Sequence, residues 1–369
     1  MKIIHFIDEI KMGGAQTHLL TIVKEMLIQH PNDVHKIVVL FEDDSLSDKF
    51  REVGIEVECL NLRKYFSTKS YFKIISILKK YIKNEKPKIV ETHLTWSRLL
   101  VNTAAKLANV KKRIGFEQGD IYLNSIFFKI TNFFSQFIFD TIIVCSEELK
   151  IWTNKTHHIA NTKLKVMYNC IDLVKFKPVE SKQLEKVLDK KLPKFNFITV
   201  GTLGKGVNKR VDVSIKATAI LKEKGFDVGL IVCGDGEQKQ DLEKLAIDLG
   251  IESQVQFLGM RNDIPKILPH AFAFVHAAPY EPFGIVCIEA MASGLPAIVP
   301  NSGGIQKIVS DGVDGYVYEH LDENHLAIKM ETLLLNNSYS IMVECALEKI
   351  KKYDVKLYVE ELYKLYHAK

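Results

Sequence analysis

Two glutamates, Glu281 and Glu289, stand eight positions apart in this chain, with a proline and a glycine between them. Pro282 favours the first turn of a helix, and Gly284 lacks the Cβ that would keep a ligand away from the backbone. The apolar run that follows predicts a short helix, whose free N–H groups attract phosphate or sugar oxygens. Carboxylates before this helix and two turns along it can accept hydrogen bonds from hydroxyl groups. The segment therefore predicts a site for an anionic or polyhydroxylated ligand, rather than two solvated side chains on a surface helix.

Short apolar runs alternate with longer helical patterns along the sequence, which indicates the elements that would position these glutamates. Such alternation is typical of βα units, which build parallel sheets covered by helices. A chain of 369 residues is too long for one ordinary core, so we expect an α/β fold with two doubly wound domains. The runs are 3–7, 36–41, 88–91, 141–145, 195–200, 228–233, 272–276 and 297–300.

The domain boundary is expected near 172–178, before the charged stretch 180–194. Ligands of doubly wound sheets bind at the carboxyl ends of the strands, which in a two-domain protein means the cleft between the domains. We therefore expect Gly13 and Gly14, after the first strand, on one side of the cleft. Lys209 and the two glutamates are expected on the other side.

Several segments resemble retaining glycosyltransferases of family 4, which have the GT-B fold. The pattern Glu281-x7-Glu289, with Phe283-Gly284 and the run 289–296, carries the likeness. Other segments agree with the family in the same order: 13–16, 169–172 with Phe176, 200–203, 209–212, 233–236, 255–259 and 301–304. The likeness covers essentially the whole chain, strongly after residue 165 and loosely between 40 and 140.

The resemblance implies an N-terminal acceptor-binding domain over 1–174 and a C-terminal nucleotide-sugar-binding domain over 175–350, both Rossmann-like. It also implies that the last segment, 351–369, is a helix that packs back on the N-terminal domain. The donor would be a nucleotide diphosphate sugar, with a UDP-sugar as the first expectation, and no other cofactor is expected.

By resemblance, the donor sugar would be held by Glu281 together with the backbone at Phe283 and Gly284. Glu289 would hold the ribose hydroxyls, and main-chain atoms from Leu258 to Arg261 would flank the base. Each contact suits its partner, because carboxylates accept hydrogen bonds from diols and backbone groups can read a planar base.

The diphosphate needs cations and close backbone approach. Lys209, in a loop after the strand that ends at Val200, is the first candidate cation, with Lys205 and Arg210 as further ones. Gly13 and Gly14 would let backbone amides approach the phosphates and the sugar, although tight turns after strands use glycine in any case. An ordinary surface lysine is the alternative for Lys209.

Three positions deserve separate interpretation because they depart from the family pattern or end other strands. Thr202 stands where the family usually has an arginine, so one phosphate contact is absent or moved to another cation. Glu117 stands at or near a position that is often histidine, where a carboxylate would accept from a sugar or acceptor hydroxyl or be unrelated. His93 ends another strand, and acceptor contact and plain strand-end packing are equally compatible with it.

The sequence predicts no metal site. It has no Asp-x-Asp motif to hold a cation on the diphosphate, and its six cysteines show no metal-ligand spacing. Lys209 and helix ends would stabilise the departing diphosphate, so transfer is expected to be metal-independent. The resemblance implies retention of the anomeric configuration.

Charge and composition bear on location. The excess of Lys and Arg over Asp and Glu lies in residues 1–172, and the sequence shows no signal peptide and no apolar run long enough to span a bilayer. We expect a cytoplasmic protein, with the inner face of the cytoplasmic membrane as a further setting. A basic helix near 71–88 and a phenylalanine-rich helix near 126–139 are the two candidates for membrane contact, although core packing is favoured for both. No nucleic-acid motif is present.

The predicted function is transfer of a hexose or N-acetylhexosamine to a glycan or lipid-linked glycan, in surface polysaccharide biosynthesis. One alternative is a nucleotide-sugar epimerase on the same fold, and another is a non-catalytic subunit that binds a sugar nucleotide. A nicotinamide dehydrogenase is disfavoured, because the Gly13-Gly14 loop lacks the spaced third glycine of that class.

Overall fold

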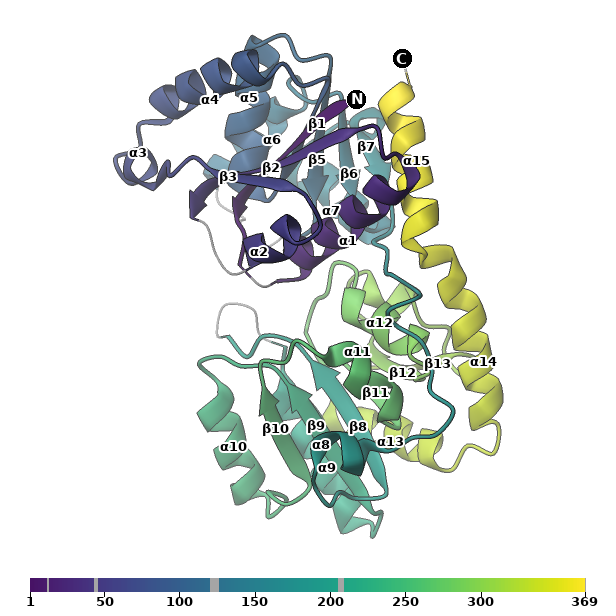
Figure 1. Ribbon diagram of the computed structural model, residues 1–369. Helices are drawn as coiled ribbons and strands as arrows, with labels where there is room; N and C mark the ends of the chain where they lie inside the picture. Colours follow the sequence, from purple (N-terminus) through teal and green to yellow (C-terminus); the bar gives the residue numbers. More distant parts are fainter. Residues whose placement is uncertain (12, 43–45, 120–125, 205–208, 369) are drawn as a thin grey trace. The chain divides into compact units, whose positions relative to one another are not determined.

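The computed structural model describes residues 1–11, 13–42, 46–119, 126–204 and 209–368, with only the backbone of Phe127 and Phe128 (Figure 1). The chain divides into two compact units. Unit 1 comprises Met1–Cys170 with Val355–Lys369, and unit 2 comprises Ile171–Asp354. Sequence analysis placed the divisions after residues 174 and 350, whereas the structure places them after residues 170 and 354.

Unit 1 contains a seven-stranded parallel sheet in the order β3-β2-β1-β4-β5-β6-β7. Two runs of strand neighbours extend outward from β1, as expected for a doubly wound sheet. The strands are β1 (Lys2–Glu9), β2 (Val34–Glu42), β3 (Glu56–Cys59), β4 (Ile89–His93), β5 (Lys112–Glu117), β6 (Thr141–Val144) and β7 (Leu164–Val166).

Successive side chains of each strand point to opposite faces of this sheet, and both faces are apolar. Helices therefore cover both faces. One core lies beneath α1, α2 and α15, and the other lies beneath α4, η1 and α5. The helix α15 returns from the end of the chain and packs beside α1 (Figure 1). The helices are α1 (Gly14–Gln29), α2 (Leu46–Arg51), α3 (Arg63–Ser67), α4 (Tyr71–Glu85), η1 (Ser97–Val101), α5 (Asn102–Leu107), α6 (Ile126–Ser135), α7 (Glu147–His157), η3 (Asn161–Lys163) and α15 (Val355–His367).

Unit 2 contains a six-stranded parallel sheet in the order β10-β9-β8-β11-β12-β13. The order again reverses next to the first strand of the unit, β8, so the carboxyl ends of β8 and β11 flank a topological switch point. The strands are β8 (Phe195–Val200), β9 (Val228–Cys233), β10 (Val255–Gly259), β11 (Ala273–Val275), β12 (Ala297–Pro300) and β13 (Gly315–Tyr318).

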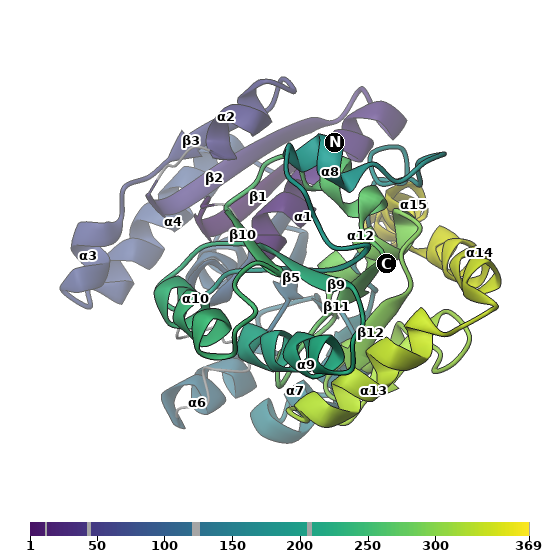
Figure 2. The ribbon, with the colours of Figure 1, turned by 90° about the horizontal axis from the view of Figure 1, so that it is seen from below.

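One face of the second sheet packs against α9, α10 and α13, and Figure 2 shows α9 and α13 side by side there. On the other face, α12 contacts β11, β12 and α14. The helices are α8 (Leu184–Leu188), α9 (Val211–Glu223), α10 (Lys239–Asp248), α11 (Ile264–Ile267), η4 (Leu268–His270), α12 (Ile285–Ala292), η5 (Ile305–Lys307), α13 (Glu323–Leu334), α14 (Tyr339–Ile350) and η6 (Lys351–Tyr353).

The two helices singled out for membrane contact differ in their packing. The helix α4 buries Ile74, Leu78 and Ile82 and exposes Lys73, Lys80 and Lys83, as expected for an ordinary surface helix. On α6, by contrast, Ile126, Ile130 and Phe134 are all more than half exposed, so core packing explains only part of its apolar character. Among the described residues, no helix is long and apolar enough to cross a lipid bilayer.

Candidate active site

The carboxyl edge of the unit 2 sheet brings the first glutamate of the sequence pattern beside the predicted lysine. Glu281 lies in the segment between β11 and α12, whereas Lys209 lies in the segment between β8 and α9. The lysine Nζ is 2.5 Å from Glu281 Oε2, and both side chains are about four-fifths buried, with exposed fractions of 20% and 17%. Residues 72 positions apart in sequence therefore form one charged pair at the switch point of the sheet.

A histidine completes this group. His276 follows β11 directly, and its Nε2 lies 3.4 Å from the same Oε2 atom of Glu281. Its side chain is 5% exposed, and burial lowers its pKa although Glu281 opposes that effect. Sequence analysis missed His276. Its position at the end of a strand, five residues before Glu281, was the available signal.

The carboxylate of Glu281 stays ionised in this setting. Burial raises its pKa, but the charge of Lys209 and the contact with His276 outweigh burial and lower the pKa to about 2. At neutral pH the site therefore holds a carboxylate and a lysine ammonium in direct contact. A phosphate can compete for the ammonium, and sugar hydroxyls can donate to the carboxylate.

The loop after β12 fixes the backbone of Glu281. The Gly304 N–H donates to the Glu281 carbonyl oxygen at 2.8 Å, and the Ser302 hydroxyl donates to the Pro279 carbonyl oxygen at 2.5 Å. Gly303 adopts φ +67°, and a Cβ built there would lie 2.3 Å from the Glu281 carbonyl oxygen. Glycine is thus required at 303 for both conformation and space.

The helix α12 begins later than the sequence suggested. Pro282 precedes the helix rather than occupying its first turn, because Gly284 adopts a left-handed conformation, φ +98°, and turns the chain into α12. Phe283 is 3% exposed and packs edge-to-face against Tyr353, with ring centroids 5.7 Å apart. Glu289 accordingly lies about one turn into the helix, not two.

Glu289 has an electrostatic environment opposite to that of Glu281. Burial raises its pKa to about 7, and the charge of Lys175 offsets only part of this effect. A carboxyl group with this pKa changes its charge near neutral pH. Hydroxyl donors from a ligand would favour the ionised form.

The remaining candidates of unit 2 lie at the same edge of the sheet, but they differ in their contacts. The stem of Lys209 packs over Gly201. Arg210 forms a two-bond fork with Asp212 at 2.8 and 2.9 Å, and Arg261 forms one with Asp263 at 2.8 and 2.6 Å. Thr202 is exposed after β8, and Leu258 lies in β10, half-buried. The predicted cation Lys205 lies outside the described residues.

In unit 1, Gly13 and Gly14 mark the start of α1, where Gly13 is the N-cap in extended conformation. Glu117 ends β5 and is buried in an ion pair with Arg98, and its other oxygen accepts from the Gly119 N–H at 3.1 Å. Sequence analysis missed Arg98, because nothing in the helical pattern around it signals a buried cation. Glu117 therefore fixes the chain at Gly119 as well as carrying charge.

His93 ends β4 and is buried, with its ring stacked on Phe116 at a centroid distance of 4.5 Å. Its polar neighbours include His5, Glu91 and His18.

The arrangement of two parallel doubly wound sheets defines the GT-B fold class, and comparison with solved structures agrees. The Anabaena protein HepE in complex with UDP superposes with a TM-score of 0.82 at 20% identity, covering 99% of both chains. The Staphylococcus aureus protein TarM, in a complex with UDP, superposes with a TM-score of 0.77 at 13% identity, covering 100% of both chains. At such identities the likeness shows the fold.

Comparison with sequence families identifies the group of enzymes. The family described as "Glycosyl transferases group 1" matches residues 180–352, and the family described as "Glycosyltransferase Family 4" matches residues 12–175. The chain belongs to this group of glycosyltransferases.

Two curated relatives illustrate the range of the group. The chain is 28% identical over 331 residues to an Escherichia coli UDP-Gal:alpha-D-GlcNAc-diphosphoundecaprenol alpha-1,3-galactosyltransferase, covering 85% of this chain and 84% of the relative. It is 30% identical over 183 residues to the Bacillus anthracis N-acetyl-alpha-D-glucosaminyl L-malate synthase, covering 49% of this chain and 47% of that relative.

The close contact of the Gly303–Gly304 backbone with Glu281 leads to a prediction. Gly303→Ala is expected to destabilise unit 2 by at least about 2 kcal/mol more than Gly312→Ala. Both glycines have positive φ, at +67° and +79°, so both variants carry the same conformational penalty. Only Gly303 faces the Glu281 backbone, whereas a Cβ at Gly312 meets nothing within 4 Å. Urea unfolding of both variants measures the difference. Equal losses of unfolding free energy would show that contact with the Glu281 backbone does not require glycine at 303.

Proposed function

We propose that this glycosyltransferase transfers a sugar from a UDP-sugar to a glycan or lipid-linked glycan, with retention of anomeric configuration and without a metal on the diphosphate. The observation that carries the proposal is the contact of Lys209, Glu281 and His276 at the carboxyl edge of the unit 2 sheet. A diphosphate sugar needs a cation at its phosphates and acceptors at its hydroxyls, and this group supplies both.

The chemical step requires stabilisation of the charge that develops on the departing diphosphate. Lys209 supplies a cation whose partner, Glu281, can be exchanged for phosphate oxygens without moving the lysine stem off Gly201. The N–H groups at the start of α12 add a positive dipole end. Once Lys209 turns to phosphate, Glu281 is released to accept from sugar hydroxyls. His276 then remains beside the carboxylate as a neutral partner.

The choice of donor and acceptor class rests on relatives. The Escherichia coli relative is named for UDP-Gal and an acceptor on diphosphoundecaprenol, and another relative, from Rhizobium meliloti, is named for lipopolysaccharide core biosynthesis. HepE is described in complexes with UDP and with UDP-glucose. These names favour a UDP-sugar and an acceptor of surface polysaccharide biosynthesis, in the cytoplasm.

We assign the donor to unit 2 and the acceptor to unit 1. In unit 1, Gly13 is the N-cap of the 16-residue helix α1, whose start has no side-chain cap, and its first N–H groups would donate to phosphate or sugar oxygens. Glu117 acts as a positioning residue: its ion pair with Arg98 holds the carboxylate that accepts from Gly119. Acceptor contact at the end of β5 would therefore involve the backbone near Gly119.

The test combines a donor screen with two variants of the charged pair. A UDP-sugar should raise the thermal unfolding midpoint of the protein, and with acceptor it should give a product of unchanged anomeric configuration by NMR. Activity should not require added Mg²⁺ or Mn²⁺ in the assay. Lys209→Ala and Glu281→Gln should each lower turnover at least about a hundredfold, because each removes a group that contacts the reacting ends of the donor.

Lys216→Ala is the matched control, since Lys216 lies in α9 and pairs with Glu323 at 3.5 Å, away from Glu281. Circular dichroism should show all three variants folded. Turnover near normal in Lys209→Ala or Glu281→Gln would remove that residue from the site. An epimer formed from donor alone would indicate an epimerase, and donor binding with no reaction would indicate a binding subunit.

Glu289 predicts a pH dependence of donor binding. Ribose hydroxyls bind the ionised carboxylate better, so affinity for a UDP-sugar should rise about tenfold between about pH 6 and pH 8, as Glu289 loses its proton near pH 7. In the free protein, the contribution of Glu289 to folding stability changes with pH in the opposite direction. The raised pKa means that Glu289 lowers folding stability as pH rises from its ordinary pKa of 4.5 to about 7.

Calorimetric titration with a UDP-sugar measures this dependence free of phosphate titration, because a diphosphate diester stays ionised throughout the range. Glu289→Gln should bind more weakly than the wild type at high pH and show a flat profile. A wild-type profile that is flat as well would argue against a contact between Glu289 and the ribose.

We also propose that α6 contacts an anionic membrane surface where a lipid-linked acceptor is presented. Ile126, Ile130 and Phe134 lie at intervals of four on one side of α6 and are exposed by 78%, 53% and 58%, and Phe137 just beyond the helix is exposed by 61%. Such an apolar stripe, in the basic half of the chain, suits insertion at the lipid headgroup level. The lysines of α4 would add attraction to anionic lipid.

Co-sedimentation with vesicles containing phosphatidylglycerol tests this contact. Phe134→Ser combined with Phe137→Ser should lower the bound fraction at least about fivefold, because each change removes roughly 2 kcal/mol of apolar burial. Ile247→Ser, at a 61% exposed position of α10 in unit 2, is the control and should bind as the wild type does. Unchanged binding of the double variant would exclude α6 from the contact.

A further inference from the structure

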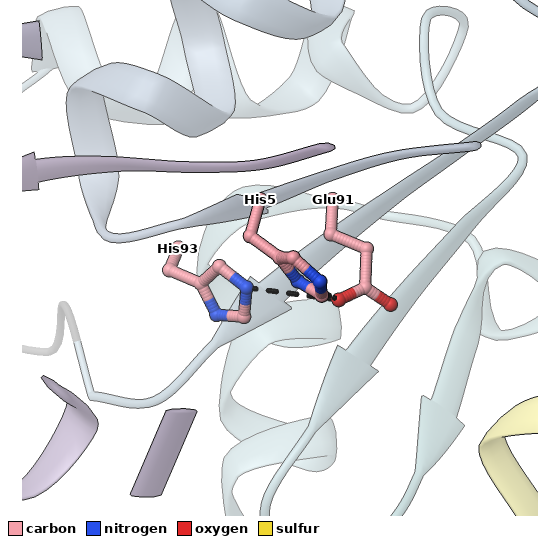
Figure 3. A group of neighbouring side chains, drawn as sticks. All are labelled: His5, Glu91 and His93. Atoms are coloured by element: carbon pink, nitrogen blue, oxygen red, sulfur yellow. Dashed lines mark ion pairs between the residues drawn. The ribbon is translucent and has the colours of Figure 1, made fainter. Parts of the chain in front are cut away.

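A second group of polar side chains lies in the core of unit 1. His5 comes from β1, and Glu91 and His93 come from the neighbouring strand β4. His5 is in register with Glu91, and Glu91 and His93 are two positions apart on one strand, so all three project from the same face of the sheet. Their exposed fractions are 0%, 1% and 2%, and Figure 3 shows their polar ends gathered together.

The distances within the group suit three ligands around one ion. His5 Nδ1 lies 2.8 Å from Glu91 Oε2, and His93 Nε2 lies 3.8 Å from the same oxygen. Each residue offers one donor atom, and the three atoms lie within 4.8 Å of one another. Donors about 2.05 Å from a tetrahedral zinc ion are separated by about 3.3 Å, which falls between the two measured contacts.

The hydrogen bonding of these side chains is incomplete on the inside of the group. His5 Nδ1 and both ring nitrogens of His93 have no hydrogen-bond partner among the residues that the structure describes. Buried polar atoms without partners are costly, and two of these nitrogens, His5 Nδ1 and His93 Nε2, lie within 4 Å of one carboxylate oxygen.

The outer atoms of His5 and Glu91, by contrast, have hydrogen-bond partners. His5 Nε2 is 3.1 Å from His35 Nδ1, and the Tyr366 hydroxyl of α15 donates to Glu91 Oε1. His93 is oriented by its stack on Phe116. Partners that fix the far side of a histidine or carboxylate, with the near side left free, are typical of ligands in metal sites.

We propose that His5, Glu91 and His93 bind one zinc ion through His5 Nδ1, Glu91 Oε2 and His93 Nε2. Two imidazoles and a carboxylate are a donor set that zinc accepts. A doubly charged cation would satisfy the carboxylate and two of the three unpartnered nitrogens together. A proton on His5 would satisfy the carboxylate but would leave both His93 nitrogens without partners.

The site would be structural, and it is independent of the donor site proposed for unit 2. It would join β1 to β4 and, through Tyr366, join both strands to α15. Sequence analysis expected no metal because it searched for cysteine spacing and Asp-x-Asp. A glutamate and a histidine on alternate positions of a strand, with a histidine on its neighbour, carry no such local pattern.

Zinc binding by the full chain tests the proposal. The protein, without a histidine tag, is stripped with a chelator and titrated with Zn²⁺ against a competing indicator. One equivalent should bind and raise the thermal unfolding midpoint. X-ray absorption at the zinc edge should show nitrogen and oxygen ligands with no sulfur.

Two variants and a control locate the ion. His93→Phe keeps a ring on Phe116 and removes both nitrogens, so it should fold and should bind Zn²⁺ at least about a hundredfold more weakly. Tyr366→Phe removes only the outer hydrogen bond and should weaken binding about tenfold, whereas a purely structural role for Tyr366 would leave zinc affinity unchanged. His367→Ala changes an exposed histidine of α15 and should bind as the wild type does.

Three results would overturn the assignment: a wild-type protein that takes up no stoichiometric zinc, sulfur ligands at the zinc edge, or a His93→Phe variant that binds as tightly as the wild type. The absorption measurement uses the wild type alone and does not depend on the variant folding. Loss of glycosyl transfer with zinc binding intact would concern only the function proposed for unit 2.

Discussion

The contact between Lys209 and Glu281 is the interaction on which the site of unit 2 depends. Neither side chain is in free water, and each would be costly to leave alone at four-fifths burial. Each therefore fixes the other, and the backbone bond from Gly304 to Glu281 fixes both to the sheet. A diphosphate that takes Lys209 releases Glu281 at the same moment. The ion pair thus keeps an ionised carboxylate and a cation ready without a bound ligand.

The two glutamates of the sequence pattern have different electrostatics, although they share one segment. Glu281 has a cation and a histidine against it, so its pKa falls to about 2, whereas burial raises the pKa of Glu289 to about 7. Environments that drive the pKa values of paired carboxyls apart are how proteins assign them separate tasks. Here one carboxylate remains charged at every physiological pH, and the other gains its charge most readily when hydroxyl groups arrive. A fixed contact to the sugar and an adjustable contact to the ribose are consistent with that difference.

Sequence patterns predicted the class of fold well, because buried parallel strands are continuous apolar runs and glycines after strands signal tight turns. Strands β3, β5 and β7 are absent from the predicted apolar runs because charged residues interrupt each of them, whereas the equally short β11 and β12 are uninterrupted and were predicted. Spacing along the chain suggested Glu281 and Glu289, but it could not show that Lys209 touches Glu281, since only the folded sheet brings residues so distant in sequence together. Pro282 was misplaced because the left-handed turn at Gly284 starts the helix later. His276 and Arg98 were missed because each acts through a partner on another segment.

Unit 1 depends on the last helix for more than apolar contact. Three tyrosines of α15 reach into its core, and two of them donate to carboxylates of other elements: Tyr366 to Glu91 in β4, and Tyr363 to Asp33 at 2.7 Å. A hydroxyl that donates to a buried carboxylate specifies one register of the helix. Sliding α15 by one residue would break this hydrogen bond and leave the carboxylate oxygen without its donor. Apolar packing alone tolerates such a shift far better. The polar atoms beneath α15 therefore determine where the helix sits, and the buried histidines beside Glu91 belong to the same constraint.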